Sequence, residues 1–250
     1  MRIATWNVNS IKQRLPRFLP WLDARAPDVI CLQEDQTADD AIAELLDDEL
    51  ARPGHRGGRG RGAVERRGIA VQGRARRRRA RPAGRPGFPD VEARAVSATC
   101  AGIRVHSLYV PNGRAVGSDH YEYKLAWLDA LRRDVADGPA DALICGDMNI
   151  APADADLFDP TAYLGQTHVT EPERAALREL YELGLHDIVR ERWPADQVFS
   201  YWDYRAGMFH QNLGMRIDLI LGSAPVTERV KAAWIDRQAR KGTGPSDHAP

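Results

Sequence analysis

Apolar runs that end abruptly in acids and amides constrain the fold of this chain more than any other feature of its sequence. The segments DVICLQE and DALICGDMNI are continuous apolar runs of strand length, and each closes on polar groups. Such runs are typical of strands that are buried on both faces. The segment RIATWNVN alternates like a strand, and MRIDLILG reads as a late strand. These patterns predict a protein built around buried β-sheet.

Segments with helical spacing separate the predicted strands. The predicted helices cover residues 10–26, DDAIAELLDDELA, residues 119–135 and residues 173–183. Pro16 and Pro20 break the pattern of the first. Two further strands, EARAVSATC and GIRVHSLYV, share a tight Ala-Gly turn, and VKAAWID reads as another late strand. Strands that interleave with helices predict an α/β fold, and the lack of a repeat or clear boundary predicts one domain over residues 1–250.

Composition narrows the class of protein and its compartment. Hydrophobic residues make up 43% of the 250, an ordinary share for a globular chain. No run of 18 apolar residues occurs, so we expect no membrane span, and MRIATWNVNS alternates too early for a signal peptide. Cys31, Cys100 and Cys145 lack metal-type spacing. We interpret them as buried free thiols of a cytoplasmic protein, and we take a monomer as the default state.

Polar residues with oxygen and imidazole groups gather at the ends of the predicted strands. They form five clusters, namely Asn7 with Asn9, Gln33 with Glu34, Asp147 with Asn149, Asp218, and Ser246 with Asp247 and His248. Any one of them alone is more readily explained by a structural role. Five clusters in this order are far more specific. Carboxylate and amide oxygens suit Mg²⁺ or Mn²⁺, and a histidine beside an acid suits general base catalysis or stabilisation of a reacting phosphate.

Six segments, in this order and spacing, resemble the motifs of the exonuclease III family: TWNVNSI, DVICLQE, YVPNG, GDMNIAP, RIDLIL and SDHAP. This family is a branch of the endonuclease/exonuclease/phosphatase superfamily, and the resemblance covers most of residues 1–51 and 86–250. It implies a four-layered α/β sandwich like that of DNase I, with two mixed β-sheets face to face and helices outside. It also implies a DNA repair nuclease that uses Mg²⁺ or Mn²⁺ to hydrolyse phosphodiester bonds at abasic sites and 3′ ends of double-stranded DNA. Such an enzyme would act on the nucleoid in the cytoplasm.

The same resemblance implies a role for each residue of the clusters. Glu34 would hold the metal, with Asn7 and Asp247 close by. Asp147 and Asn149 would flank the scissile phosphate and position or activate water. The implied set of groups around the metal is Asn7, Glu34, Asp147, Asn149, Asp247 and His248. Asp218 would orient His248, a pairing that fixes the tautomer and charge of the imidazole. Whether Asp147 or the His248 pair deprotonates the water stays open.

A second group of residues would contact the DNA. The resemblance implies that Tyr109 hydrogen-bonds the phosphate and that Lys124, in YEYKL, lies near the DNA backbone. The segment YWDYRAGMFHQNLG is similar to the loop that covers the abasic sugar. Its wedging, stacking or phosphate-binding residues would be Trp202, Met208, Phe209 and Asn212. For Trp202, packing in the core is an alternative of equal weight.

Residues 52–85 do not resemble the rest of the chain. They contain 13 arginines and one acid, Glu65, so their net charge of +12 offsets a net charge of −12 elsewhere. The segment reads as a DNA-binding arm, as a disordered loop, or as the product of two compensating frameshifts. Residues 63–68 can be encoded so that the next frame gives Gln-Trp-Asn-Gly-Val, which resembles a family motif that is absent here. We favour the frameshift, and expect local disorder, the loss of two family strands and marginal stability.

The chain stops at Pro250, directly after SDHAP, where members of the family continue with a final apolar strand. We therefore expect Asp247 and His248 to lie on a fraying terminus. Two other functions stay open: a phosphatase or phosphodiesterase of the same fold, and a catalytically impaired nucleic-acid binder. The loop in YWDYRAGMFHQNLG argues against the phosphatase, because it resembles the DNA-repair branch. The impaired binder would bind DNA in a salt-sensitive way without cleaving it.

Overall fold

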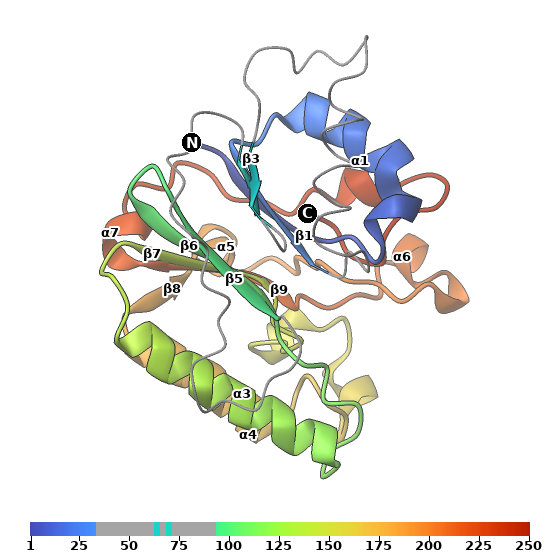
Figure 1. Cartoon of the computed structure of the whole chain (residues 1–250). Coiled ribbons are helices and arrows are strands. Elements are labelled where there is room, and N and C mark those ends of the chain that lie inside the picture. The colour runs from blue at the N-terminus through green and yellow to red at the C-terminus, as the bar shows by residue number, and fades with distance from the viewer. Residues whose placement is uncertain (34–62, 66–68, 72–93) are drawn as a thin grey trace.

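The computed structural model describes residues 1–33, 63–65, 69–71 and 94–250, and two β-sheets form its centre (Figure 1). The first sheet has the strand order β1-β2-β4-β3. In it, β1 (Ile3–Asn7) runs parallel to β2 (Val29–Gln33). β4 (Ile69–Val71) is antiparallel to both β2 and β3 (Ala63–Glu65). The strands predicted at RIATWNVN and DVICLQE are confirmed.

The second sheet has the strand order β5-β6-β7-β9-β8. Its strands are β5 (Ala95–Cys100), β6 (Ile103–Tyr109), β7 (Ala142–Asp147), β8 (Leu185–Asp187) and β9 (Asp218–Ser223). β6 and β7 are parallel and the other neighbours are antiparallel, so this sheet is mixed. β5 and β6 meet at the predicted Ala-Gly turn, where Ala101 and Gly102 have φ values of 48° and 87°.

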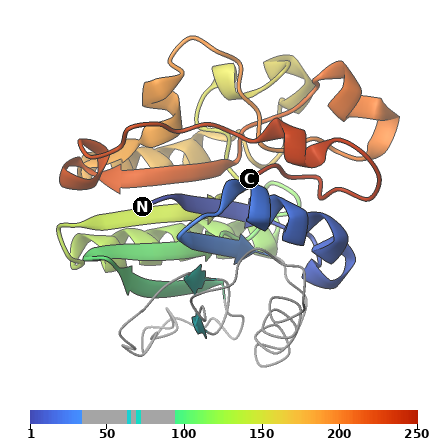
Figure 2. The same ribbon diagram turned by 90° about the horizontal axis from the view of Figure 1, so that it is seen from above.

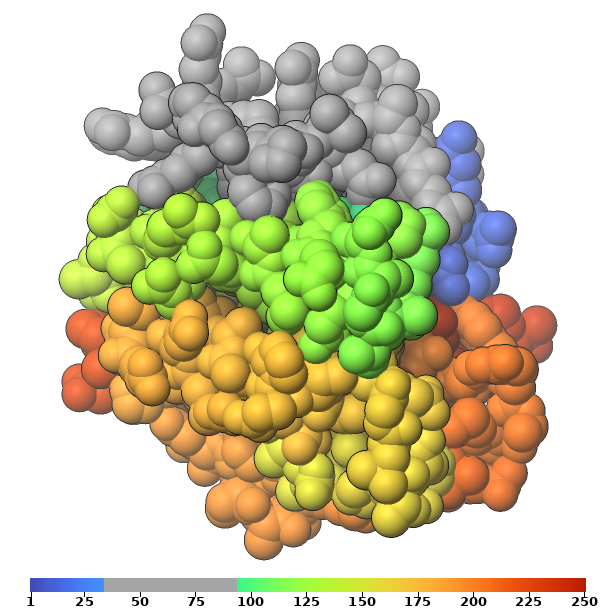
Figure 3. Space-filling model, turned by 90° about the horizontal axis from the view of Figure 1, so that it is seen from below, coloured from blue at the N-terminus to red at the C-terminus, as the bar shows by residue number. Residues whose placement is uncertain are grey.

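Helices cover the outer face of each sheet. α1 (Ile11–Arg25) packs on the first sheet, where Phe18 and Leu22 join Trp6 in one apolar cluster. α3 (Asp119–Ala136) and α4 (Glu171–Glu182) lie side by side over the second sheet (Figure 3). Between the sheets, Cys31 packs with Cys145 and other apolar side chains, and the longer strands of both sheets lie roughly along one common axis (Figure 2). This order of layers confirms the four-layered α/β sandwich.

Short helices occupy the connecting segments. They are α5 (Ile188–Arg192), α6 (Met208–Gln211), α7 (Ala224–Thr227) and the 3-10 helices Asp154–Asp156, Pro160–Tyr163, Arg205–Gly207 and Arg237–Arg240. Within the described part of the chain, none of the helices combines the length and hydropathy needed to cross a membrane. The three cysteines are buried and free, as predicted.

α1 runs through both of the prolines that interrupt its sequence pattern. Pro16 and Pro20 lie inside the helix, and both side chains are exposed. A proline leaves the carbonyl of the residue four positions earlier without its helical partner. Here that face of α1 is turned outward, since Lys12 is exposed too, so water can satisfy the freed carbonyl groups.

Two expectations about strands are wrong. Residues 52–85 were expected to supply no strand, yet β3 and β4 fall within them. β4 pairs with β2, and β3 pairs with β4. The late strand predicted at VKAAWID does not form. The carbonyl of Val230 accepts a hydrogen bond from Arg192, and that of Ala233 accepts one from Trp193 Nε1 at 2.7 Å, so side chains take the place of a neighbouring strand. The expected disorder around these strands and the helix predicted at DDAIAELLDDELA lie outside the described residues.

Gly146 sets the distance between β6 and β7, one residue before Asp147. Its φ is 142°, and a Cβ placed there would lie 1.9 Å from the carbonyl oxygen of Leu108. No side chain fits that separation, and only glycine adopts this backbone angle at low cost. The sequence GDMN therefore places Asp147 on a strand that approaches its neighbour unusually closely.

Candidate active site

Three of the predicted site residues lie on one row across the second sheet. The register pairs Tyr109 at the end of β6 with Asp147 at the end of β7, and Asp147 with Asp218 at the start of β9. Residues that pair in this way direct their side chains to the same face of a sheet. Asn7 ends β1 of the other sheet, and its Nδ2 donates to Asp147 Oδ2 at 3.0 Å. The ends of strands from both sheets therefore meet at Asp147.

His248 completes this row from the far end of the chain. Its Nδ1 lies 2.8 Å from Asp218 Oδ2, and its Nε2 lies 3.7 Å from Asp147 Oδ2. The imidazole is buried and packs against the ring of Tyr201, with centroids 5.0 Å apart. The predicted pairing of Asp218 with His248 is present in the structure, and the same imidazole faces a second carboxylate.

The segment that carries His248 is fixed, contrary to the expected fraying. Ser246 Oγ donates to Asn7 O at 2.7 Å and accepts from His248 N at 3.2 Å. Trp6 Nε1 donates to His248 O at 3.1 Å. All of these groups are buried. Because β1 and the 246–248 segment are bonded to each other on both sides of the imidazole, the position of His248 is set by the first strand of the chain.

Asp147 is held by two neutral donors. Asn7 donates to its Oδ2, and the backbone N–H of Asn149 donates to its Oδ1 at 2.9 Å. Asn149 itself has a φ of 50°, a conformation that asparagine tolerates better than most residues. Its side-chain Nδ2 donates to Val110 O at 2.9 Å, so the turn after β7 is tied to the end of β6. The carboxylate of Asp147 is therefore oriented by the backbone that follows it.

Burial and neighbouring charges shift the protonation of both reactive groups. Burial raises the pKa of Asp147 to about 7; His248 opposes this shift and Asp218 adds to it. Burial alone would lower the pKa of His248, but the carboxylates of Asp218 and Asp147 outweigh burial and raise that pKa to about 10. At neutral pH the imidazole therefore carries a proton, while Asp147 titrates close to neutrality.

The acidic groups of this cluster fit a divalent cation. Ligand atoms of Asp147, Asp218 and His248 all lie within 4.8 Å of one another. Asp218 Oδ1 is buried and has no hydrogen-bond partner among the described residues, and such an acceptor is rare unless an ion or water satisfies it. Two carboxylates face a single imidazolium, so the cluster retains negative charge. Carboxylate oxygens in this arrangement suit a hard cation.

The structure does not bring all the predicted metal ligands together. Glu34 lies outside the described residues. Asp247 is not part of the group of three, and its Oδ1 accepts from Asn9 Nδ2 at 3.2 Å. The Oδ1 of Asn7 accepts from Asn9 N at 3.1 Å. The metal roles of these residues and of Asn149 stay predictions.

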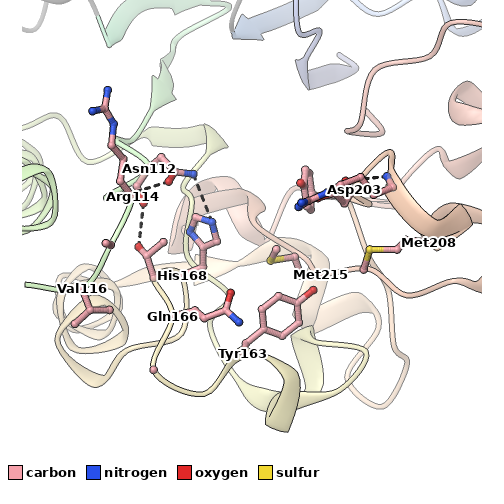
Figure 4. A pocket seen from close by; sticks show the side chains of 14 residues that line it. Asn112, Arg114, Val116, Tyr163, Gln166, His168, Asp203, Met208 and Met215 are labelled. Carbon is pink, nitrogen blue, oxygen red and sulfur yellow. Dashed lines mark hydrogen bonds and ion pairs between the residues drawn. The ribbon is translucent and has the colours of Figure 1, made fainter. Parts of the chain in front are cut away.

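A pocket of about 630 Å³ opens beside the cluster (Figure 4). Its walls come from residues 112–116, 163–168 and 201–215. Tyr201 separates the pocket from His248, and Met208, predicted to contact the abasic sugar, lines it. Asn212 is exposed at the end of α6 and is not among the lining residues. Of the predicted sugar-binding residues, only Met208 therefore lies in the pocket wall.

Two residues of the pocket wall were missed by the sequence reasoning. Asn112 Nδ2 lies 3.5 Å from His168 Nε2, and Figure 4 shows these two side chains pointing toward each other. Asn112 Nδ2 donates to Asn149 Oδ1 at 3.2 Å, and His168 Nδ1 lies 2.8 Å from Asn149 O. Burial lowers the pKa of His168 to about 4, so its neutral ring donates to that carbonyl. Asn112 belongs to the quoted YVPNG motif and could have been found there. His168 has a φ of 82° in a loop without any pattern that marks it.

Three of the residues predicted to contact DNA are buried in the structure. Lys124 is 0% exposed and bonded to Glu173, so no atom of it can reach a phosphate. Trp202 is also 0% exposed, and packs edge-on against Phe199 and Phe209 with centroids 6.5 and 5.3 Å apart. The core-packing alternative for Trp202 is therefore correct. Phe209 belongs to the same buried cluster and is 8% exposed.

The comparisons with known proteins agree with this geometry. The sequence profile described as the Endonuclease/Exonuclease/phosphatase family matches residues 4–248. Exodeoxyribonuclease III from Haemophilus influenzae is 30% identical, over 100% of this chain and 98% of that protein. The 3′ phosphatase NExo from Neisseria, solved with a product DNA hairpin, has a TM-score of 0.87 and 34% identity over 100% of this chain and 96% of that one. An AP endonuclease from Archaeoglobus fulgidus has a TM-score of 0.86 and 32% identity, over 100% of this chain and 97% of that one. The chain therefore belongs to the endonuclease/exonuclease/phosphatase family.

Proposed function

We propose that this chain is a metal-dependent DNA repair nuclease, which hydrolyses phosphodiester bonds at abasic sites and 3′ ends of double-stranded DNA. The observation that carries the proposal is the buried row of Asp147, Asp218 and His248 beside an open pocket. The names of the relatives, an exodeoxyribonuclease III, an AP endonuclease and a 3′ phosphatase bound to DNA, support DNA as the substrate. We further propose that the enzyme acts as a monomer in the cytoplasm, on the nucleoid.

The geometry favours different roles for the two reactive groups. Hydrolysis of a phosphodiester needs a water in line with the leaving group and neutralisation of charge on the phosphate oxygens. His248 stands between two carboxylates and is held protonated, so it supplies positive charge and a hydrogen bond to the phosphate. Among the described residues, Asp147 has two neutral donors besides that imidazolium, and it is the group left to take the proton of the attacking water. Tyr109, on the same row, would add a hydrogen bond to the phosphate.

A bound Mg²⁺ or Mn²⁺ would offset negative charge on the reacting phosphate. Asp147 and the unpaired Oδ1 of Asp218 are the described oxygens that fit such an ion, with Glu34 as the further ligand implied by sequence. Asn7 would keep Asp147 oriented toward it.

The pocket would receive the sugar at an abasic site or the last nucleotide of a 3′ end. Arg114 and Arg205 line it and offer positive charge to the adjoining phosphates. Met208 and Met215 give it an apolar side that suits a deoxyribose. A site without a base costs less to turn out of the helix than a paired nucleotide, so this shape favours damaged DNA.

The proposal is tested on three duplexes: one with a single abasic analogue, one with a recessed 3′ hydroxyl and one with a 3′ phosphate. Each is incubated with Mg²⁺ and with EDTA. His248→Ala is compared with His186→Ala. His186 lies on β8, away from the site, and its exposed side chain pairs with Glu191 of α5. We expect metal-dependent cleavage that is lost in the first variant and unchanged in the second.

The pattern of products separates the alternatives. Nicking beside the abasic analogue assigns an endonuclease, stepwise shortening assigns an exonuclease, and release of phosphate alone assigns a 3′ phosphatase. Salt-sensitive binding of DNA without any cleavage by folded protein would contradict the proposal and favour the impaired nucleic-acid binder. Hydrolysis of phospholipid or inositol phosphates instead of DNA would favour the other branch of the fold.

A further inference from the structure

A fully buried ion pair lies directly behind the wall of the pocket. Lys124 on α3 and Glu173 on α4 are both 0% exposed, and Lys124 Nζ donates to Glu173 Oε1 at 2.5 Å. Taking two charges out of water is costly, and an apolar pair of similar volume commonly stabilises a fold equally well. The reaction proposed above uses neither side chain directly. Their contacts therefore point to a role other than stability alone.

Lys124 holds the backbone of both asparagines in the wall. Its Nζ donates to Asn149 O at 2.7 Å and to Asn112 O at 3.3 Å. The side chains of these asparagines are bonded to each other at 3.2 Å. One ammonium group thus fixes two carbonyls, and Asn149 is the residue whose N–H orients Asp147.

Glu173 holds the loop on the other side of the same wall. Its Oε1 accepts from Thr167 Oγ1 at 2.7 Å and from His168 N at 3.0 Å, and its Oε2 accepts from Thr170 N at 3.0 Å. Burial raises the pKa of Glu173, but Lys124 and these hydrogen bonds outweigh burial and lower it. The carboxylate therefore stays ionised at neutral pH. This loop also carries His168, whose Nδ1 contacts Asn149 O.

We infer that Lys124 and Glu173 form a positioning unit, which sets the backbone of Asn149 and His168 and through Asn149 the direction of the Asp147 carboxylate. This inference rests on the proposed nuclease function, since it concerns the same site. The unit touches no DNA, because both members are fully buried. Its loss should therefore change the rate of the chemical step and leave the affinity for DNA almost unaltered.

The test compares Lys124→Met, the double variant Lys124→Met with Glu173→Gln, and the control Leu177→Ala. Leu177 lies on α4, and its buried side chain packs in the apolar core and has no polar atom, so its truncation weakens the fold without removing a side-chain bond of the unit. We measure the melting temperature, kcat and KM on the DNA that wild type cleaves best. In Lys124→Met the carboxylate is buried without its partner, and both the melting temperature and kcat should fall, kcat by about 10-fold or more.

The double variant decides between positioning and stability. It removes the unpaired charge, so its melting temperature should return toward wild type, while Asn149 O and Asn112 O still lack the ammonium group that held them both. A positioning unit predicts that kcat stays low and that KM stays within about 3-fold of wild type. Recovery of kcat together with stability, or an equal loss of kcat in Leu177→Ala, would overturn the inference. A wild-type chain that cleaves none of the three duplexes would overturn the proposed function, and the inference with it.

Discussion

At the scale of single residues, the charge of His248 depends on Asp218. Asp218→Asn keeps the shape of the side chain but removes the carboxylate that lies 2.8 Å from the imidazole. Without it the tautomer and charge of His248 are no longer fixed, and we expect kcat to fall at least about 100-fold with little change in KM. Steady-state kinetics on the best DNA substrate measure this. Asp141→Asn, at an exposed pair with Arg229, is the matched control.

Gly146 gives a second prediction at this scale. The methyl group of Gly146→Ala would meet the carbonyl of Leu108 at 1.9 Å, so β7 must move away from β6. We expect a loss of at least about 3 kcal/mol in the free energy of unfolding, measured by urea denaturation. Cys145→Ala, one residue earlier and equally buried, removes only a sulfur and serves as the control. Equal stability of the two variants would contradict this account of the strand approach.

Single residues also show where sequence reasoning stops. The partners Asp147, Asp218 and His248 could be named beforehand, because each stands in a motif whose order matches a family. The environment of Lys124 could not, since its burial depends on Glu173, which comes from another helix. A lysine on a helix reads the same in sequence whether it faces DNA or the interior. The role of His168 could not be predicted for a similar reason, because it depends on a loop that folds onto Asn149.

At the scale of elements, the pair of strands β5 and β6 makes stability depend on pH. His106 on β6 is buried, lies opposite Ser97 and shares a hydrogen bond of 2.8 Å with its hydroxyl. Burial, followed by the charge of Arg104, lowers the pKa of His106 to about 4. The unfolded chain therefore binds a proton below about pH 6.5 while the folded chain does not. Stability should be full above that pH and fall by up to about 3 kcal/mol as the pH drops toward about 4.

Urea denaturation between pH 4 and 8 measures this slope, and His106→Asn is the comparison. Asparagine can still bond Ser97 but does not titrate in this range. The slope should become shallower, though not vanish, because burial lowers the pKa of His168 in the same way. An unchanged slope in the variant would mean that His106 is not the titrating group.

The elements themselves were predictable to different degrees. β2 and β7 could be predicted as strands, and placed in the sequence, from their continuous apolar runs, because a strand buried on both faces has no polar side. β8, with three residues, is too short to show a period. VKAAWID has the composition of a strand, yet the carbonyls of Val230 and Ala233 bond to the side chains of Arg192 and Trp193, and the segment is not part of either described sheet.

At the scale of the whole molecule, one hydrogen bond joins the two ends of the chain: Ser246 Oγ donates to Asn7 O, 239 positions earlier. Ser246→Ala would break the bond to Asn7 O and leave the buried N–H of His248 without its acceptor. We expect a loss of about 1–3 kcal/mol in the free energy of unfolding, together with a fall in kcat. Ser223→Ala, at the far end of β9, removes a hydroxyl that accepts from Ala142 N and should lower stability without lowering kcat. Similar kinetics in both variants would contradict the role assigned to Ser246.

The frame of residues 52–85 is a further prediction about the whole chain. If two compensating frameshifts produced the arginine-rich segment, sequencing the gene again should recover the frame that encodes Gln-Trp-Asn-Gly-Val near residues 63–68. A single uninterrupted frame with other codons there would contradict it. The two short strands described in this range do not decide the matter, because backbone pairing makes little demand on the side chains.

The contact of β1 with the segment that carries His248 has a consequence for synthesis of the chain on the ribosome. Asn7 is translated among the first residues, whereas its neighbours in the site arrive at positions 147, 218 and 248. A nascent chain that has reached only residue 240 lacks the imidazole that stands between the two carboxylates. Synthesis from the N-terminus therefore completes the site only with its last residues. A polypeptide released before the final motif would lack the group that the proposed cleavage of DNA requires.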